Sequence, residues 1–164
     1  MEGDLQARQG SVRTPYYLID EAALERNLKV LASVRKRAGV KILLAQKAFS
    51  AFDTYPLIAK YLDGTTASGI YEARLAHEEM PTRENHVFNP AFTDEEFSEV
   101  AKWCDHIVLI SVSQNRRFTR LLNRLTAQSL NRPSLGLRVN KKPVQSSTRK
   151  YEICFAPALA ANNI

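Results

Sequence analysis

A lysine follows an unbroken apolar run in this sequence. Residues 42–45 read Ile-Leu-Leu-Ala, and Lys47 comes one residue after Gln46. In α/β proteins, reactive groups gather at the carboxyl ends of strands. A lysine held there loses part of its hydration, which favours the free amine, and a free amine can form a Schiff base with an aldehyde. The alternative is a strand-end lysine that extends into solvent.

Other polar residues occupy similar positions. Arg138 lies within the apolar run 135–139, and a buried guanidinium needs an acid, a phosphate group or a cofactor as its partner. Ser68 and Gly69 lie between a predicted strand and a predicted helix. Backbone N–H groups at such a junction can hold an anion, or they can simply begin a helix.

The remaining candidate ligands and nucleophiles show no functional spacing. His77 falls on a predicted helix, and His86 and His106 fall near strand starts, so a structural role is expected for all three. Cys104 and Cys154 form no C-x-x-C motif, so we expect neither a disulfide nor a metal site, and a reducing cytoplasm as the location. The sequence contains neither of the common glycine-rich nucleotide-binding motifs.

The positive charge is concentrated in one segment. The formal net charge is +6, and residues 111–150 contain ten Lys or Arg and no Asp or Glu. A phosphate or nucleic acid, an acidic protein partner or plain solvent could face such a segment. Phe118 is its only aromatic residue, which argues against nucleic-acid binding. The chain also has no run of about 18 apolar residues, so no membrane helix is expected.

Strand-like and helix-like segments alternate along the chain. Asp20 is a predicted helix N-cap, Gly39 a predicted helix end, and residues 93–96 have capping-box spacing. The predicted strands cover 41–46, 65–67, 86–88, 106–110 and 135–139, and the predicted helices cover 23–34, 55–61, 71–80, 94–103 and 113–130. Residues 16–19 are also β-prone, and 41–46 reads as a strand buried on both faces. The alternation indicates βαβ units and a parallel sheet. A doubly wound sheet of five strands would fit the length, and a complete (β/α)₈ barrel needs eight units.

Several motifs, in one order, resemble a known family. The sequence resembles the carboxynorspermidine decarboxylases over residues 13–140 and, more distantly, the diaminopimelate and ornithine decarboxylases of pyridoxal-phosphate fold type III. The matching segments are Thr14-Pro15-Tyr16-Tyr17-Leu18-Ile19-Asp20, Leu44-Ala45-Gln46-Lys47-Ala48-Phe49, residues 61–68 with 71–75, Asn89-Pro90-Ala91-Phe92 with Asp94-Glu95-Glu96, residues 106–108 with Ser113-Gln114 and Arg117-Phe118, and Gly136-Leu137-Arg138-Val139-Asn140.

This resemblance implies a fold, a cofactor and a reaction. The fold would be an alanine-racemase-like TIM barrel, incomplete with about five of eight βα units in residues 1–140, followed by an irregular segment, 141–164. The cofactor would be pyridoxal phosphate, with Lys47 as the catalytic lysine that binds it. Arg138 would lie by the cofactor ring, and Ser68 and Thr66 would form part of the pocket wall. The enzyme would decarboxylate a carboxylated polyamine to norspermidine or spermidine, and the family forms homodimers.

The sequence also departs from the family. The later barrel strands, the glycine-rich phosphate loop and the carboxyl-terminal β-domain have no counterpart among these 164 residues, and Lys141-Lys142 replaces a proline of the family. We therefore expect a truncated form with little or no activity. Three alternatives stay open: a non-catalytic pyridoxal-phosphate-binding module, a decarboxylase of the diaminopimelate or ornithine type, and a basic binding protein that uses residues 111–150 without a cofactor.

Overall fold

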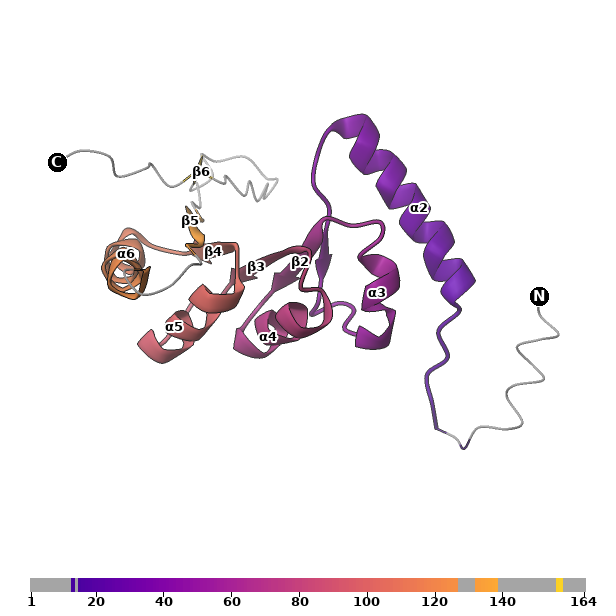
Figure 1. The fold of residues 1–164 in the computed structure, drawn as a ribbon, viewed down its shortest axis with the longest axis horizontal. Coiled ribbons are helices and arrows are strands. Elements are labelled where there is room, and N and C mark those ends of the chain that lie inside the picture. Colours follow the sequence, from indigo (N-terminus) through magenta and orange to yellow (C-terminus); the bar gives the residue numbers. More distant parts are fainter. Residues whose placement is uncertain (1–12, 14, 127–131, 139–155, 158–164) are drawn as a thin grey trace, which may run out of the picture.

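The structure is a computed structural model that describes residues 13, 15–126, 132–138 and 156–157. These residues contain a single β-sheet. Its six strands lie side by side in chain order (Figure 1). The first five pair in parallel, and β6 pairs antiparallel with β5. The strands are β1 (Leu43–Ala45), β2 (Gly64–Ala67), β3 (Glu84–Phe88), β4 (His106–Leu109), β5 (Ser134–Leu137) and β6 (Ala156–Pro157). The predicted α/β fold with five parallel strands is confirmed.

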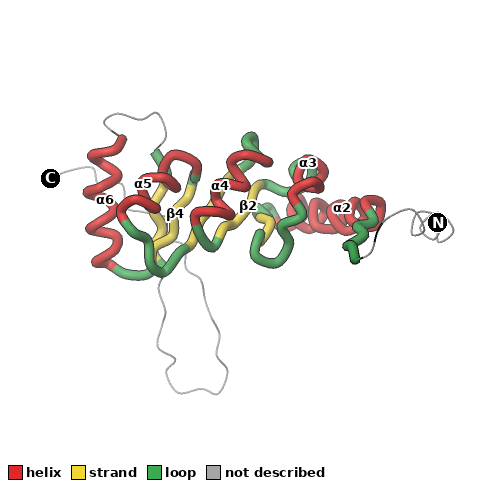
Figure 2. The backbone as a smooth tube through the Cα atoms, turned by 90° about the horizontal axis from the view of Figure 1, so that it is seen from below, coloured by secondary structure: helices red, strands yellow, loops and turns green. Residues whose placement is uncertain are grey.

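The helices alternate with these strands. They are α2 (Glu21–Ala38), the 3₁₀ turn η1 (Phe52–Thr54), α3 (Tyr55–Ile58), α4 (Ile70–Glu79), α5 (Asp94–Trp103) and α6 (Val112–Thr126). Helices α4 and α5 lie below the sheet in Figure 1, and in Figure 2, seen from below, they lie in front of the strands. The end of the predicted helix 113–130 and the boundary at residue 140 fall outside the described residues. So does the predicted irregular segment 141–164, apart from β6.

The helix ends form as the sequence predicts. The Asp20 carboxylate accepts a hydrogen bond from the Ala23 N–H at 2.9 Å, and Gly39 ends α2 in the left-handed region with φ 64°. Glycine adopts this conformation without a Cβ clash. Thr93 and Glu96 form a capping box at the start of α5, which satisfies two N–H groups that the helix itself leaves free.

The core lies between the sheet and the helices. Alternate strand residues, including Val87, Ile107 and Leu135, pack with Phe97 of α5 and Phe118 of α6. A second cluster fills the β1 end of the sheet and joins α2, α3 and the segments around them. Its buried members are Leu28, Tyr55, Ile58, Leu62 and Met80.

The opposite face of the sheet is covered by no helix in the described part of the chain. Parallel register aligns Ala45, Thr66, His86, His106 and Ser134 in one row on this face. We call this uncovered side of the sheet the open face. The prediction that 41–46 is buried on both faces is therefore wrong, because residues 42–45 are only half-buried. The β-prone residues 16–19 also form no strand: Tyr17 is fully exposed, Leu18 is 52% exposed, and none of the described strands pairs with them.

None of the described helices has both the length and the apolar character needed to cross a membrane.

Candidate active site

The predicted site residues lie along one edge of the sheet. Because β1 to β5 are parallel, residues that follow each strand share its carboxyl edge. Lys47 lies in a turn two residues beyond β1, Ser68 follows β2 directly, and Arg138 follows β5 directly. Thr66 lies inside β2 on the open face. The structure thus brings Lys47, Ser68 and Arg138 to one edge, with Thr66 one row below it.

Lys47 lies on a turn with firm anchors. The Gln46 N–H donates to the Thr66 carbonyl of the neighbouring strand at 3.2 Å, and the Ala48 N–H donates to the Ala45 carbonyl at 3.0 Å. The Lys47 side chain itself is exposed. The desolvation expected from the sequence is therefore absent from this structure, because the turn and the uncovered sheet face leave the amine in contact with solvent.

A buried pair holds this turn against the helix layer. Gln46 is 1% exposed and Tyr55 of α3 is fully buried. The Tyr55 hydroxyl donates to Gln46 Oε1 at 3.2 Å. Burial raises the pKa of Tyr55 to about 12, so the phenol keeps its proton and remains a donor. Nothing in the sequence pattern indicates this pair, since the two residues are nine positions apart.

Replacing Tyr55 by phenylalanine is expected to lower the free energy of unfolding by about 1–3 kcal/mol, because a buried acceptor on Gln46 would lose its donor. Urea unfolding followed by circular dichroism measures this loss. Tyr71→Phe is the control, since Tyr71 is 86% exposed and its change should stay within about 0.5 kcal/mol. Equal stabilities of the two variants would contradict the role given to the Tyr55 hydroxyl.

Ser68 lies at the start of α4, where the sequence allowed an anion site. Its backbone N–H donates to Glu72 Oε2 of the same helix. The Glu72 carboxylate thus already takes the place of an external anion at this N–H group. The Ser68 side chain is exposed, and Thr66 is half-buried between Ala45 of β1 and His86 of β3.

Arg138 reaches across one strand to an aromatic ring. The backbone N–H of Arg138 donates a hydrogen bond to the Leu109 carbonyl of β4 at 2.7 Å. Its guanidinium carbon lies 5.2 Å from the centroid of Phe88, the last residue of β3. A ring face attracts a cation. The sequence predicted an acid, a phosphate group or a cofactor as the partner of this guanidinium. Within the described residues no carboxylate forms an ion pair with Arg138. Its observed side-chain contact is the ring of Phe88.

One basic residue of the segment 111–150, Arg117, forms an ion pair while its side chain stays exposed. Arg117 of α6 pairs with Asp94 of α5, with 2.9 Å between Nη2 and Oδ1, and it lies 5.1 Å from the ring centroid of Phe118. These contacts give Arg117 a place in the packing of α5 against α6.

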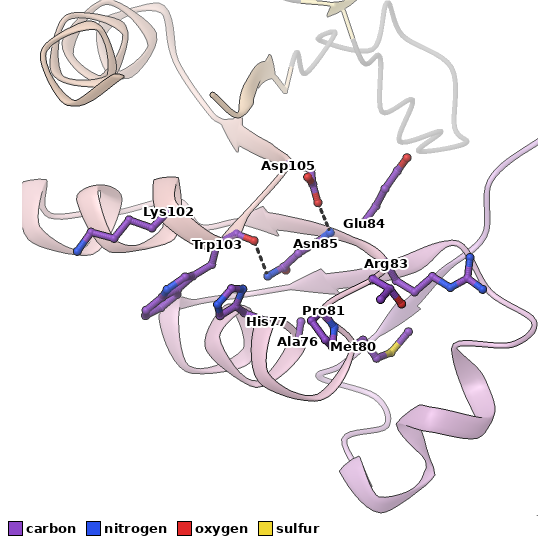
Figure 3. A pocket seen from close by; sticks show the side chains of 11 residues that line it. Ala76, His77, Met80, Pro81, Arg83, Glu84, Asn85, Lys102, Trp103 and Asp105 are labelled. Atoms are coloured by element: carbon purple, nitrogen blue, oxygen red, sulfur yellow. Dashed lines mark hydrogen bonds between the residues drawn. The ribbon is translucent and has the colours of Figure 1, made fainter. Parts of the chain in front are cut away.

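A cavity of about 370 Å³ lies near the amino-terminal end of strand β3. Residues of α4, β3 and α5 line it, including His77, Asn85 and Trp103 (Figure 3). The rings of His77 and Trp103 stack at 6.0 Å between centroids. Asn85 Nδ2 donates to the Ala73 and Trp103 carbonyls at 2.8 and 3.3 Å. None of the predicted site residues lines this cavity, and its hydrogen bonds tie α4 and α5 to β3.

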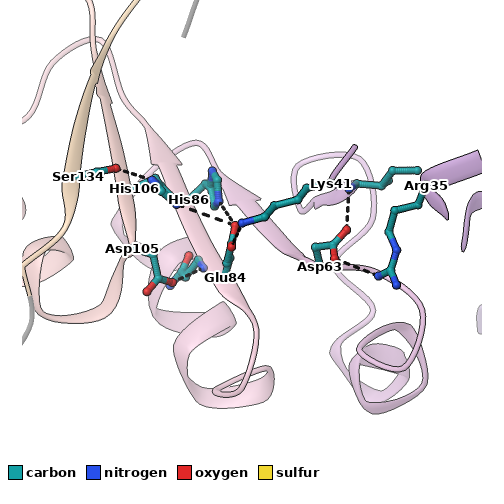
Figure 4. Close-up of polar contacts among 10 residues, drawn as sticks. Arg35, Lys41, Asp63, Glu84, His86, Asp105, His106 and Ser134 are labelled. Atoms are coloured by element: carbon teal, nitrogen blue, oxygen red, sulfur yellow. Dashed lines mark hydrogen bonds and ion pairs between the residues drawn. The ribbon is translucent and has the colours of Figure 1, made fainter. Parts of the chain in front are cut away.

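A polar cluster on the open face was not predicted. Glu84 Oε1 accepts from Lys41 Nζ, while Glu84 Oε2 lies 3.0 Å from His86 Nε2 and 3.9 Å from His106 Nε2 (Figure 4). Burial alone would raise the pKa of Glu84, but hydrogen bonds from Lys41 and His86 hold it below its ordinary value. The carboxylate therefore stays ionised between three nitrogen groups. The two histidines are structural in the sequence-based interpretation, and the structure places them together.

Comparisons with known proteins support the fold and the family resemblance. The chain is 43% identical over 129 residues to a carboxynorspermidine/carboxyspermidine decarboxylase of Herminiimonas arsenicoxydans, a match over 79% of this chain and 33% of the relative. It is 35% identical over 143 residues to the Campylobacter jejuni protein of the same name, which covers 87% of this chain and 35% of the relative. A carboxyaminopropylagmatine decarboxylase of Synechocystis is 29% identical over 149 residues, 91% of this chain and 37% of the relative.

A solved structure matches as well. The crystal structure of carboxynorspermidine decarboxylase complexed with norspermidine, from Campylobacter jejuni, superposes with a TM-score of 0.69 and 37% identity, over 77% of this chain and 32% of that one. No protein-family model matches the sequence. The chain spans about a third of the length of the relatives it matches. The structural match to this part of the enzyme confirms the predicted partial barrel.

Proposed function

We propose that this chain, which is similar in sequence and fold to about a third of a carboxynorspermidine decarboxylase, carries the cofactor lysine of a pyridoxal-phosphate-dependent decarboxylase of carboxylated polyamines. The observation that carries this proposal is the position of Lys47 at the carboxyl edge of β1, within a sheet that superposes on that enzyme at a TM-score of 0.69. The products would be norspermidine or spermidine.

The residues at the carboxyl edge fit the carbonyl and the ring of this cofactor. Lys47 offers an exposed primary amine that can bind an aldehyde. Arg138 offers a planar cation already held against Phe88. We propose no phosphate contact at the Ser68 amide, because Glu72 occupies it. Ser68 and Thr66 remain proposed parts of the pocket wall.

Each residue has a distinct task in the proposed reaction. When bound, pyridoxal phosphate supplies a ring that takes up the electrons left by loss of CO₂. Lys47 would bind and orient the cofactor from a turn that Gln46 fixes to β2. Arg138 would contact the bound ring, and its own position is fixed by the Phe88 ring and the Leu109 carbonyl. The whole enzyme would be a cytoplasmic homodimer, as the family resemblance implies.

Borohydride reduction after incubation with pyridoxal phosphate tests the role of Lys47. We expect the pyridoxyl label on Lys47 in clear excess over Lys60, another exposed lysine, when peptides are mapped by mass spectrometry. Lys47→Ala should remove the principal label, and Lys60→Ala should leave it unchanged. Even labelling of both lysines would show that this edge has no organised cofactor site.

We also propose that these 164 residues alone catalyse little or no decarboxylation, because they span about a third of their relatives' length. Release of CO₂ from carboxynorspermidine, with pyridoxal phosphate present, should not exceed that of Lys47→Ala. Turnover well above this control would contradict the expectation and would assign the full activity to these residues.

A further inference from the structure

The polar cluster of the open face comes from three strands and the segment before β1. Glu84 and His86 lie two residues apart on β3, so both point to the same face. His106 of β4 is the register partner of His86, and Ser134 of β5 is the register partner of His106. Lys41 reaches the same place from the segment before β1 (Figure 4). The sheet itself therefore brings these side chains together.

Three ligand atoms in the cluster converge. One ring nitrogen each of His86 and His106 and one oxygen of Glu84 all lie within 4.8 Å of one another. The carboxylate oxygen is 3.0 Å from one imidazole nitrogen and 3.9 Å from the other. Ligands bound tetrahedrally at about 2.0–2.1 Å lie about 3.3–3.4 Å apart. The Glu84–His86 distance is already shorter than this separation, and His106 Nε2 must move about 0.5 Å closer to the carboxylate oxygen to reach it.

The neighbouring residues orient these ligands. The Ser134 hydroxyl bonds Nδ1 of His106, so that nitrogen can carry the proton while Nε2 keeps its lone pair for a cation. Lys41 bonds Glu84 Oε1 and leaves Oε2 facing the two histidines. Supporting hydrogen bonds of this kind fix ligand orientation in metal sites.

A hydrogen bond between Glu84 and His86 accounts for only part of this arrangement. At 3.9 Å, His106 Nε2 is beyond hydrogen-bond distance of the carboxylate. Its ring nevertheless lies 4.2 Å from that of His86 between centroids. A single dication would contact both imidazole nitrogens and the carboxylate oxygen together. The positive charge of Lys41 opposes such a cation, so its binding should be weaker than in a structural zinc site with four protein ligands.

We propose that Glu84, His86 and His106 form a binding site for a divalent transition metal of the Zn²⁺ class, with the fourth coordination position on the open face. Two imidazole nitrogens and a carboxylate oxygen suit Zn²⁺ and exclude Ca²⁺ or Mg²⁺ as preferred ions. The site lies at the amino ends of β3 and β4, away from the carboxyl edge that holds Lys47. It is therefore independent of the function proposed above.

Metal titration of the purified chain, after treatment with a chelator, tests this site. Competition between the protein and a chromophoric chelator for Zn²⁺ should reveal one equivalent of bound metal, and Co²⁺ should give the visible absorption of a tetrahedral complex. His106→Gln should weaken Zn²⁺ binding by about 100-fold or more, and Ser134→Ala by about 10-fold, since it removes only the supporting hydrogen bond. His77→Gln, which alters the exposed histidine of α4, should bind as the parent does.

Circular dichroism of each variant controls for folding. Because Ser134 is exposed, Ser134→Ala tests the site even where a histidine variant fails to fold. The proposal is overturned if the parent chain takes up no Zn²⁺ in competition with the chelator. It is equally overturned if folded His106→Gln binds Zn²⁺ as tightly as His77→Gln.

Discussion

Replacing Gly64 by alanine is expected to lower the free energy of unfolding by about 3 kcal/mol or more. A Cβ at Gly64 would overlap the carbonyl oxygen of Glu84 and lie 2.7 Å from its carbonyl carbon. Gly64 and Glu84 are register partners at the start of β2 and β3. Because backbone cannot turn aside as a flexible side chain does, the two strands must separate, and overpacking of this kind is strongly destabilising.

Gly136→Ala provides the matched control in the same sheet. The nearest atom to a Cβ at Gly136 is Val108 Cγ2 at 3.5 Å, an ordinary van der Waals distance. Urea unfolding of both variants should show a large loss for Gly64→Ala and a change within about 1 kcal/mol for Gly136→Ala. Similar midpoints for the two variants would show that β2 and β3 do not approach as closely as described.

Replacing Phe118 by alanine is expected to cost about 3–5 kcal/mol of stability, the usual range for a buried aromatic residue. Phe118 is fully buried. Its ring stacks on Phe97 at 4.3 Å between centroids and meets Phe92 edge-on at 6.1 Å. These three rings join α6, α5 and the segment before α5, so their loss would open a cavity between two helices and the sheet.

Val112→Ala controls for the helix itself. Val112 begins α6 and is 55% exposed, so its truncation should change the unfolding free energy by no more than about 0.5 kcal/mol. Thermal unfolding by circular dichroism separates the two cases. If Phe118→Ala unfolds at the temperature of Val112→Ala, the aromatic stack does not stabilise the fold.

The alternation of elements was predictable because it depends on local patterns. The apolar run before Lys47 gives β1, the spacing at Thr93 and Glu96 gives the capping box of α5, and Gly39 ends α2. Such signals act within a few residues. Helix α3 is shorter than its predicted range, 55–61, and follows the 3₁₀ turn at 52–54. Its single turn packs into the core through Tyr55 and Ile58.

Features that depend on the partners of each strand could not be predicted in this way. The apolar pattern of residues 42–45 is typical of a strand covered on both sides, yet the described helices cover one side only. Glu84, His86 and His106 meet because β3 and β4 pair in one register, and a spacing of twenty residues between two histidines carries no such information. The same holds for Tyr55 and Gln46, whose contact crosses from α3 to the turn after β1.

The order of the strands has a consequence for synthesis of the chain. Each strand from β2 to β4 pairs with the strand before it and the strand after it in the sequence. A nascent polypeptide can therefore add one βα unit at a time to the edge already formed, without waiting for a distant segment to leave the ribosome. Folding of this kind pairs only strands that are consecutive in the sequence, which limits the loop-closure entropy of each step. Protease resistance of ribosome-bound chains should rise in steps as successive strands emerge.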